Sequence, residues 1–242
     1  MSMNLQALAL RNGGDERRAY FASAEAGDAQ ASAALVEALL SEAELARFAK
    51  LSFPLKQQGF LLGRLAAKRA LSALLAEPDL CRIEIRSGVF GQPLVYHPRS
   101  VGVEVSLSHS HGLAVALAYP GEFPLGMDVE TVSADSADAV LAELQISDAE
   151  KAWLAAQALA PTVACGVLWT AREALGKSMK IGLNCPLGTL ALDRIEPAGA
   201  AAWIGQYANF PQSRCLSQQS GGRILSIAIP RTVEVMTWPL VF

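Results

Sequence analysis

Two stretches of this chain, 106 positions apart, predict the same local structure. Ser41-Glu42-Ala43-Glu44 and Ser147-Asp148-Ala149-Glu150 both have the spacing of a capping box. In that motif the serine hydroxyl accepts a backbone N–H and the glutamate three residues later reaches back to the serine N–H. The same offset relates Leu62 to Leu168, near the start of the following helix in each half. The pattern predicts an internal duplication, with helices followed by strands in each half.

The clearest strand signal lies in the middle of the chain. Apolar residues alternate with polar or small ones from Val101 to Ser108, and an unbroken apolar run follows from Leu113 to Tyr119. The short connection Ser108–Gly112 between the two runs predicts a β-hairpin. Elsewhere the sequence predicts helices over 29–40 and 56–76, a strand over 81–86, and closing strands over 223–229 and 233–242.

A domain boundary is predicted directly after this hairpin. Pro120-Gly121 ends the second strand, and Pro124 precedes the next extended stretch. We therefore expect an N-terminal lobe, residues 1–119, and a C-terminal lobe, residues 120–242. Because both lobes belong to one chain, we expect a monomer.

Composition excludes several classes of protein. Of the 242 residues, 52% are hydrophobic and 18% are charged, which indicates a folded globular chain. The net charge of −3 argues against duplex nucleic acid as a partner. The four cysteines form no C-x-x-C pair, so reduced thiols fit better than zinc or disulfides. The apolar run Leu5–Leu10 has no preceding cation and does not resemble a signal peptide. We expect a cytoplasmic protein that does not enter membranes.

Two acidic clusters lie on elements that are predicted to differ in type. Side chains alternate between faces along a strand, so Asp128 and Glu130 share one face of the short extended stretch Leu125–Glu130. Glu173 and Lys177 are four residues apart and share a face of a predicted helix. If this strand and this helix pack together, three carboxylates and an ammonium converge. Such a site suits a divalent cation and a phosphate.

Each cluster alone also has a plainer explanation. Asp128 and Glu130 would suit the solvent-facing edge of a strand, although apolar neighbours and Gly126 favour a half-buried stretch that a ligand or another backbone approaches closely. Glu173 and Lys177 would suit an ordinary salt bridge on a helix surface. A glycine inside a helix costs about 1 kcal/mol relative to alanine. Gly176 therefore indicates that something needs space beside Lys177.

The segment Ser108-His109-Ser110-His111 leaves three alternatives open. Two histidines on a hairpin could bind zinc, but no third ligand is evident nearby. Turn residues that bond local backbone are the plainer alternative, and contacts from Ser108 and His109 to a phosphate or ribose are the third. Common nucleotide and hydrolase motifs are missing from the sequence: it contains no G-x-S-x-G, no Walker lysine loop and no G-x-G-x-x-G.

Four motifs together resemble the 4′-phosphopantetheinyl transferases, in their longer surfactin-type or enterobactin-type branch. They occur in that family's order and span most of residues 40–190: Gly91-Gln92-Pro93, Ser108-His109-Ser110, Gly126–Glu130 and Trp169–Lys177. The resemblance implies an α+β fold. It would consist of two similar lobes related by a pseudo-twofold axis, each with an antiparallel sheet and packed helices.

The resemblance also implies an activity, namely transfer of phosphopantetheine from coenzyme A to a serine of an apo acyl or peptidyl carrier protein, with release of 3′,5′-ADP. Magnesium, or alternatively manganese, would be held by Asp128, Glu130 and Glu173 and would neutralise charge on the phosphoryl oxygens. Lys177 would add a positive charge. Glu173 is the first choice for the catalytic base, directly or through a metal-bound water, and Glu130 is the second.

The same resemblance assigns coenzyme contacts to the N-terminal lobe. Ser108 and His109 would contact the phosphates or ribose, and Gln92 and Pro93 would lie along the adenosine end. Further phosphate-binding cations would be Lys56 and Arg86, whereas Arg64 is either a third such cation or a helix-surface charge.

This chain departs from the family pattern at two positions. Gln92 and Arg172 stand where lysine is usual, so we expect activity with altered coenzyme affinity. Two rival functions remain. One is a catalytically weak homologue that binds coenzyme A or a carrier, and the other is a magnesium-dependent phosphohydrolase that needs no carrier.

Overall fold

The computed structural model describes residues 4–28, 33–131, 133–156 and 159–242, and the chain divides into two compact units. Unit 1 comprises residues 1–122 and 235–242, and unit 2 comprises residues 123–234. The sequence analysis assigned the whole tail to the second lobe. Residues 235–242 instead cluster with unit 1, because β12 (Glu234–Val235) lies beside β1 (Asn4–Asn12) and Met236 N donates to Ala9 O at 3.0 Å.

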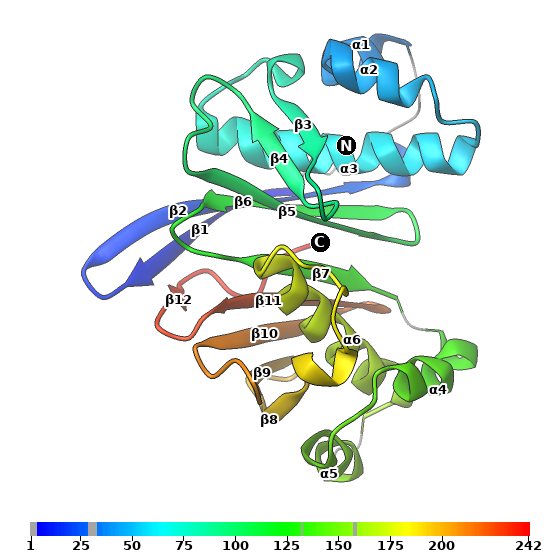
Figure 1. The fold of residues 1–242 in the computed structure, drawn as a ribbon, viewed down its shortest axis with the longest axis vertical. Coiled ribbons are helices and arrows are strands. Elements are labelled where there is room, and N and C mark those ends of the chain that lie inside the picture. Colours follow the sequence, from blue (N-terminus) through cyan, green and yellow to red (C-terminus); the bar gives the residue numbers. More distant parts are fainter. Residues whose placement is uncertain (1–3, 29–32, 132, 157–158) are drawn as a thin grey trace. The chain divides into compact units, whose positions relative to one another are not determined.

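Unit 1 contains a five-stranded sheet in the order β12-β1-β2-β6-β5 (Figure 1). Its other strands are β2 (Asp15–Glu25), β5 (Val103–Ser110) and β6 (Leu113–Pro120). The pairs β1–β2, β2–β6 and β6–β5 are each antiparallel. Helix α3 (Pro54–Leu75) packs on β2, β5 and β6. It begins with a proline at its first turn and ends at Ala76, which has a left-handed backbone. Unit 1 also contains α1 (Ala33–Leu39), α2 (Glu42–Phe48), β3 (Glu84–Ser87), β4 (Pro93–Tyr96) and the 3₁₀ turns Ala26–Asp28 and Leu80–Arg82.

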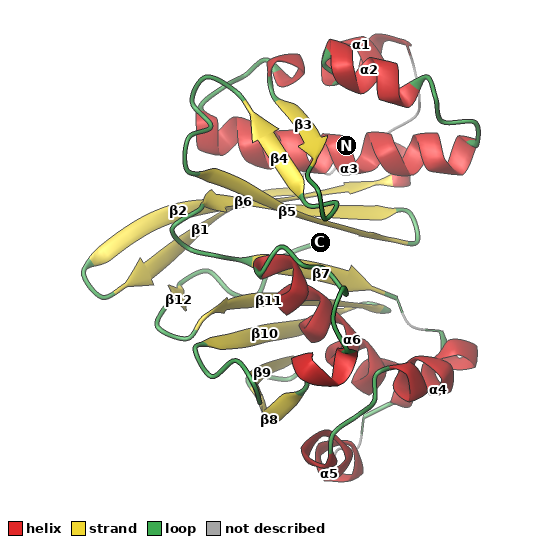
Figure 2. Cartoon of the chain, in the orientation of Figure 1, coloured by secondary structure: helices red, strands yellow, loops and turns green. Residues whose placement is uncertain are grey.

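Unit 2 contains an antiparallel sheet in the order β7-β11-β10-β9-β8. Figure 2 shows its strands in yellow and its helices in red. Helix α6 (Pro161–Ser178) packs on β7, β10 and β11. The strands are β7 (Gly126–Glu130), β8 (Leu192–Pro197), β9 (Ala202–Tyr207), β10 (Ser213–Ser220) and β11 (Arg223–Pro230). The unit is completed by α4 (Ala134–Glu143), α5 (Asp148–Ala156) and the 3₁₀ turn Leu187–Leu190. The predicted α+β class, with a sheet and packed helices in each lobe, is confirmed.

Both predicted capping boxes are present. In unit 1 the Ser41 N–H donates to Glu44 Oε2 at 3.0 Å, and the Glu44 N–H donates to Ser41 Oγ at 3.3 Å. In unit 2 the corresponding Ser147 and Glu150 bonds measure 2.8 and 3.2 Å. The offset of 106 residues therefore relates equivalent helix starts within the two units.

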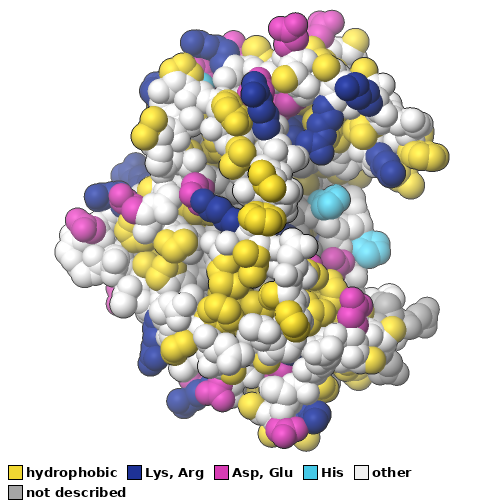
Figure 3. Space-filling model, in the orientation of Figure 1, with side chains coloured by type: hydrophobic (Ala, Val, Ile, Leu, Met, Phe, Trp, Pro, Cys, Tyr) yellow, Lys and Arg dark blue, Asp and Glu magenta, His cyan; other side chains and the backbone are white. Residues whose placement is uncertain are grey.

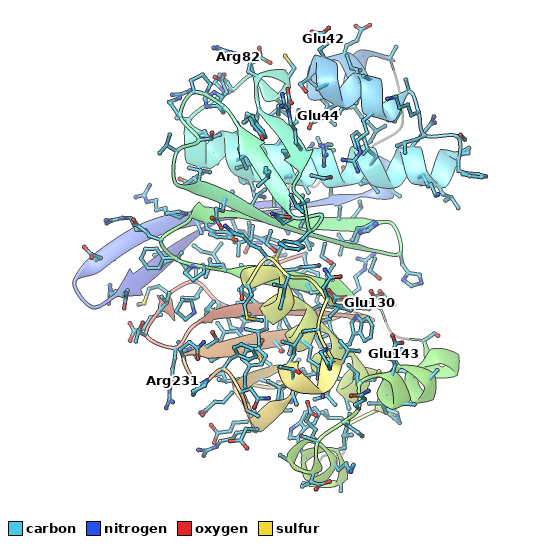
Figure 4. All side chains as sticks on the ribbon, viewed as in Figure 1. Glu42, Glu44, Arg82, Glu130, Glu143 and Arg231 are labelled. Carbon is cyan, nitrogen blue, oxygen red and sulfur yellow. The ribbon has the colours of Figure 1, made fainter. Side chains whose placement is uncertain are left out.

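Each capping-box glutamate also forms a buried ion pair with the long helix of its unit. Glu44 pairs with Arg64 at 2.8 Å and with Lys68, and Figure 4 shows Glu44 in the region of α2 and β3. Glu150 pairs with Arg172 at 2.5 Å, and neither of these two side chains is exposed to solvent. A buried charge is tolerated only when it is paired and hydrogen-bonded. The long helix of each unit is thus fixed to the preceding helix by a carboxylate.

Backbone groups complete each of these buried pairs in the same way. The Ile85 N–H donates to Glu44 Oε1 at 3.1 Å, and the Leu192 N–H donates to Glu150 Oε1 at 3.0 Å. Lys68 Nζ donates to the Leu39 carbonyl at 2.6 Å, and Arg172 donates to the Leu144 carbonyl. One carboxylate therefore joins two helices and the following strand region in each unit.

The hairpin predicted in the middle of the chain is present, but its turn is shorter than expected. β5 continues through Ser110, and only His111 and Gly112 form the turn. Both have positive φ, 43° and 77°, which matches the backbone of a two-residue hairpin turn. Ser108 and His109 are therefore strand residues.

Three other expectations differ from the structure. The region predicted as a strand over 81–86 begins with a 3₁₀ turn, and β3 starts at Glu84. The tail over 233–242 contains only the two-residue β12. The N-terminal hairpin β1–β2 was not predicted. The predicted helix over 29–40 is α1, and residues 29–32 lie outside the described residues. None of the described helices is both long and apolar enough to cross a membrane.

Replacing Arg172 with alanine should destabilise unit 2 strongly, because Glu150 would keep its charge without a partner in the interior. Breaking such a buried pair typically costs about 3–5 kcal/mol. Urea denaturation measures the loss. The matched control is Arg194→Ala, whose partner Glu196 is exposed; surface pairs are worth about 0–1 kcal/mol. Equal losses in the two variants would contradict a structural role for the buried pair.

Candidate active site

Strand β7 brings two acidic residues towards helix α6. Asp128 is buried, with 4% of its surface exposed, and its Oδ1 lies 2.7 Å from Lys177 Nζ. Glu130 lies at the end of β7, is partly exposed, and accepts the Thr131 N–H at 2.9 Å (Figure 4). The sequence predicts that Lys177 lies near these carboxylates, but not that it pairs directly with Asp128. We call Asp128, Glu130, Glu173 and Lys177 the acidic cluster.

Two glycines allow the backbones around the acidic cluster to approach closely. A Cβ on Gly126 would overlap the Ala174 carbonyl oxygen and the Ser178 N of α6, and a Cβ on Gly176 would overlap the Gly182 carbonyl oxygen. Both expectations about these glycines are confirmed, since each accommodates another backbone. The N–H groups of residues 181 and 182 also donate to the Gly176 carbonyl at 3.0 Å each, which fixes the following loop.

The acidic cluster places like charges near one another. Burial, together with the negative charges of Asp128 and Glu130, raises the pKa of Glu173 to about 7, and the ammonium of Lys177 opposes this rise. Helix α6 packs on strand β7, so the charges of Asp128 and Glu130 act on the carboxyl of Glu173.

The equivalent positions of unit 1 show how specialised this cluster is. The offset of 106 residues maps the acidic cluster onto Ala22, Ala24, Ala67 and Leu71, all of which belong to the apolar core of unit 1. These side chains are 0–1% exposed. The positions that this sequence offset relates are thus apolar in unit 1 and charged in unit 2. Packing alone does not require acids at these positions.

The donor chemistry of the acidic cluster suits a hard divalent cation. Carboxylate oxygens are ligands that Mg²⁺ takes in proteins. Burial and the neighbouring acids disfavour the ionised form of Glu173, and a bound cation would favour it. Among the residues that the structure describes, however, no three His, Cys, Asp or Glu side chains are grouped closely enough to hold a metal ion. Lys177 occupies Oδ1 of Asp128 instead. The residues fit magnesium by chemistry, and the ammonium acts as the cation in this arrangement.

The residues predicted to contact the coenzyme lie in unit 1. Ser108 is buried on β5, and His109 is exposed beside it. A Cβ on Gly59 of α3 would lie 3.9 Å from His109 Cδ2, so this imidazole lies against the first half of α3. Lys56 is one turn earlier on α3, where its ammonium lies 5.3 Å from the centre of the Phe53 ring. His109 and Lys56 therefore belong to the same region of unit 1. Several Lys and Arg side chains are visible over unit 1 in Figure 3.

The other predicted coenzyme contacts lie at the β3–β4 hairpin. Arg86 is exposed, pairs with Glu84, and stacks 4.4 Å from the centre of the Tyr96 ring. Gln92 folds back into its own loop, where Oε1 accepts the Phe90 N–H at 2.9 Å. Pro93 begins β4. The departure at Gln92 thus has a local consequence, because its amide stabilises the turn.

Two cationic residues considered in the sequence analysis are structural. Arg64 is only 8% exposed and donates to the Ile85 carbonyl at 3.0 Å in addition to pairing with Glu44, so it is not a helix-surface charge. Arg172 is fully buried against Glu150, so its departure from lysine affects packing in unit 2. The second capping box was predicted from the sequence, but the pairing of its glutamate, Glu150, with the buried Arg172 was not.

Replacing Gly126 with alanine should destabilise the protein by about 1–3 kcal/mol, because the added methyl forces β7 and α6 apart. Thermal denaturation measures the loss. The matched control is Gly222→Ala, where an added Cβ meets nothing within 4 Å. A Gly126→Ala variant as stable as this control would show that the two backbones do not touch.

The raised pKa of Glu173 should make the metal-free protein less stable as the pH rises. A carboxyl with a folded pKa of about 7 and an ordinary unfolded pKa of about 4.5 binds its proton more tightly when folded. Stability is therefore lost between about pH 4.5 and pH 7, by at most about 3 kcal/mol at 1.36 kcal/mol per pKa unit. Urea denaturation in EDTA across this window should show the loss in the wild type and not in Glu173→Gln. Parallel curves for the two proteins would contradict the raised pKa.

A family model matches a segment of the chain that contains the acidic cluster. Residues 124–228 match the model described as the 4′-phosphopantetheinyl transferase superfamily. No curated protein matches the sequence.

Several solved structures resemble about half of the chain, with low TM-scores. A holo-ACP synthase from Plasmodium yoelii has 17% identity and a TM-score of 0.38, covering 48% of this chain and 94% of that one. A holo-(acyl-carrier-protein) synthase from Bacillus anthracis, in complex with CoA (3′,5′-ADP), has 24% identity and a TM-score of 0.37, covering 49% and 96%. The synthase from Thermotoga maritima has 20% identity and a TM-score of 0.34, covering 50% and 69%.

These TM-scores are too low to carry weight beside the family match. The matched segment contains the whole acidic cluster, the close approach at Gly126 and helix α6. Over residues 124–228 the chain matches the model of the 4′-phosphopantetheinyl transferase superfamily, which is the family that its motifs resemble.

Proposed function

We propose that this protein transfers the 4′-phosphopantetheine group of coenzyme A to a serine of an apo carrier protein, in a magnesium-dependent reaction. One observation carries the proposal: the acidic cluster lies within the segment that matches the superfamily, and the equivalent positions of unit 1 are apolar. We also propose that the protein belongs to the longer, two-lobed branch of the family and that it is a cytoplasmic monomer.

The proposed reaction is a phosphoryl-group displacement. The carrier serine oxygen forms a bond to the β-phosphorus of the coenzyme, and the bond from that phosphorus to the bridging oxygen breaks. The leaving group is 3′,5′-ADP, and the serine proton passes to a base on the enzyme. Most of the catalysis in such reactions comes from positioning and from neutralising charge on the phosphoryl oxygens.

Glu173 suits the role of base in this reaction. A base works best when its pKa is near the working pH, and burial raises the pKa of Glu173 to about 7. Glu130 is the second choice, since it is the more exposed acid at the end of β7. Lys177, which neutralises Asp128 in this structure, would offer its ammonium to phosphate oxygens when a metal ion takes over that carboxylate.

Magnesium in this proposal would be held by Asp128, Glu130 and Glu173, with manganese as an alternative. The bound ion would supply positive charge to the pyrophosphate. The protein's own residues would then bind and orient the substrate: Ser108, His109, Gln92, Pro93, Lys56 and Arg86 would contact the coenzyme. Gln92 already uses its amide oxygen in its own loop, so we expect it to contribute less to binding than a lysine would.

The deciding experiment is a mass-spectrometric transfer assay. Incubation with coenzyme A, magnesium and an apo acyl or peptidyl carrier should add one phosphopantetheine to the carrier serine, and EDTA should abolish the addition. Glu173→Gln should lower kcat by at least about 100-fold, because a general base typically contributes 10²–10⁴-fold. Asp128→Asn should raise the magnesium concentration needed for half-maximal rate.

The controls separate this function from its rivals. Glu196→Gln, an exposed acid of unit 2, should transfer at the wild-type rate. Coenzyme binding without any mass shift, across acyl and peptidyl carriers, would favour the catalytically weak homologue. Phosphate release in the absence of a carrier would favour a phosphohydrolase. Wild-type turnover in Glu173→Gln would overturn the assignment of Glu173 as base.

A further inference from the structure

Three consecutive residues of α6 are each hydrogen-bonded outside the helix, directly before Glu173. Thr170 Oγ1 lies 2.6 Å from Ser226 Oγ of β11, the Ala171 carbonyl accepts the Tyr207 hydroxyl of β9 at 2.7 Å, and Arg172 pairs with Glu150. Successive helical residues point about 100° apart because the helix has 3.6 residues per turn. Tethers at three successive positions therefore restrain rotation of α6 about its own axis.

The tether at Thr170 is a chain of three buried hydroxyl groups. Thr170, Ser226 and Ser217 are each 0% exposed, and Ser226 Oγ lies 2.7 Å from Ser217 Oγ. Thr170 donates its proton to the Gly166 carbonyl at 2.8 Å, so its oxygen accepts the Ser226 hydroxyl. Since a hydroxyl has one proton, Ser226 in turn accepts from Ser217. The terminal carbonyl fixes the direction of the whole chain.

The hydroxyl chain reaches the acidic cluster through the sheet and the helix at once. Ser226 is the cross-strand partner of Asp128, so the two side chains stand on the same face of the sheet beneath α6. Thr170 and Glu173 are three residues apart on α6 and share a helix face. Lys177, one further turn along, pairs with Asp128. Each of the two acids therefore has a hydroxyl neighbour: Thr170 precedes Glu173 on α6, and Ser226 lies across from Asp128 on the neighbouring strand β11.

Unit 1 lacks this chain at equivalent positions. Its strand register pairs Ala116 of β6 with Ala22 of β2, as Ser226 pairs with Asp128, and pairs Leu107 with Ala116, as Ser217 pairs with Ser226. Ala116 and Leu107 pack in the apolar core of that unit. Both units keep the buried carboxylate, but among the described residues the hydroxyl chain occurs in the unit that contains the acids.

We propose that Thr170, Ser226 and Ser217 are positioning residues, which set the rotation of α6 so that Glu173 and Lys177 face Asp128. The inference rests on the proposed function for its kinetic test. A buried hydroxyl chain offers directional bonds where apolar packing would tolerate small rotations, and a misplacement of about 1 Å can cost roughly 100-fold in rate. The three residues act through the helix and make no contact with substrate in this assignment.

The test compares Thr170→Val with Thr170→Ser in the transfer assay. Valine keeps the branched shape of threonine and removes the hydroxyl, so we expect kcat to fall roughly 10- to 100-fold with little change in KM for coenzyme A. Serine restores the hydroxyl and should restore most of kcat. Ser226→Ala should resemble Thr170→Val, and the double variant should be no slower than either single variant, because all act through one chain.

The matched control is Ile195→Val on β8, a core substitution in the same unit. It should lower the melting temperature about as much as Thr170→Val without changing kcat. Equal loss of kcat in this control, or wild-type kcat in Thr170→Val, would overturn the positioning role. Failure of serine to rescue would also overturn it, since the hydroxyl would then not be the group that matters.

A crystal structure of the Thr170→Val variant tests the positioning role independently of the proposed transferase function. If the wild-type protein transfers nothing to any carrier, the transferase function fails, and the variant's structure still decides the positioning. A rotated α6 with Glu173 displaced from Asp128 would support the proposal. An α6 that overlays the wild-type helix, with the acidic cluster unmoved, would contradict it.

Discussion

Each half of this protein depends on one buried carboxylate that no solvent can reach. Glu44 and Glu150 cap a short helix, accept an N–H from the segment after the long helix, and pair with a cation on the long helix itself. A carboxylate in the interior persists only while its oxygens are satisfied. Its partners must therefore stay in place together, and the position of the long helix follows from that requirement.

The two units share this buried ion pair, but they differ in the side chains that lie between the long helix, α3 or α6, and its sheet. In unit 1 the contact is made by alanine and leucine side chains. In unit 2 it is made by the acidic cluster and by the hydroxyl chain of Thr170, Ser226 and Ser217. Burial, together with the nearby negative charge of Asp128, raises the pKa of Glu173. That electrostatic cost is what a cation or a proton relieves.

Local patterns allowed much of the fold to be predicted, because they depend on neighbours in sequence. Capping boxes, the β5–β6 hairpin and the helix of Glu173 and Lys177 all belong to this class. The β1–β2 hairpin was missed because β2 buries four consecutive residues, Ala22 among them, so its burial lacks the period of two that indicates a strand.

The parts of the site that were not foreseen depend on residues distant in sequence. Arg172 looks like a surface charge beside Glu173 until Glu150, 22 residues earlier, is known to lie against it. Lys177 was expected beside Glu173 because helix spacing is regular, whereas its partner Asp128 is 49 residues away. Gln92 looked like a lost cation, and only the loop geometry shows its amide bound within the turn.

The missing side chain at Gly126 has a mechanical consequence for the acidic cluster. Since β7 and α6 already touch through their backbones at this point, the helix has no room to move inward. Displacement of α6 at this point is therefore one-sided, because the helix can move away from β7 but cannot move closer to it. Any change in the spacing between the backbones of β7, which carries Asp128, and α6, which carries Lys177, must therefore be a movement of α6 away from β7.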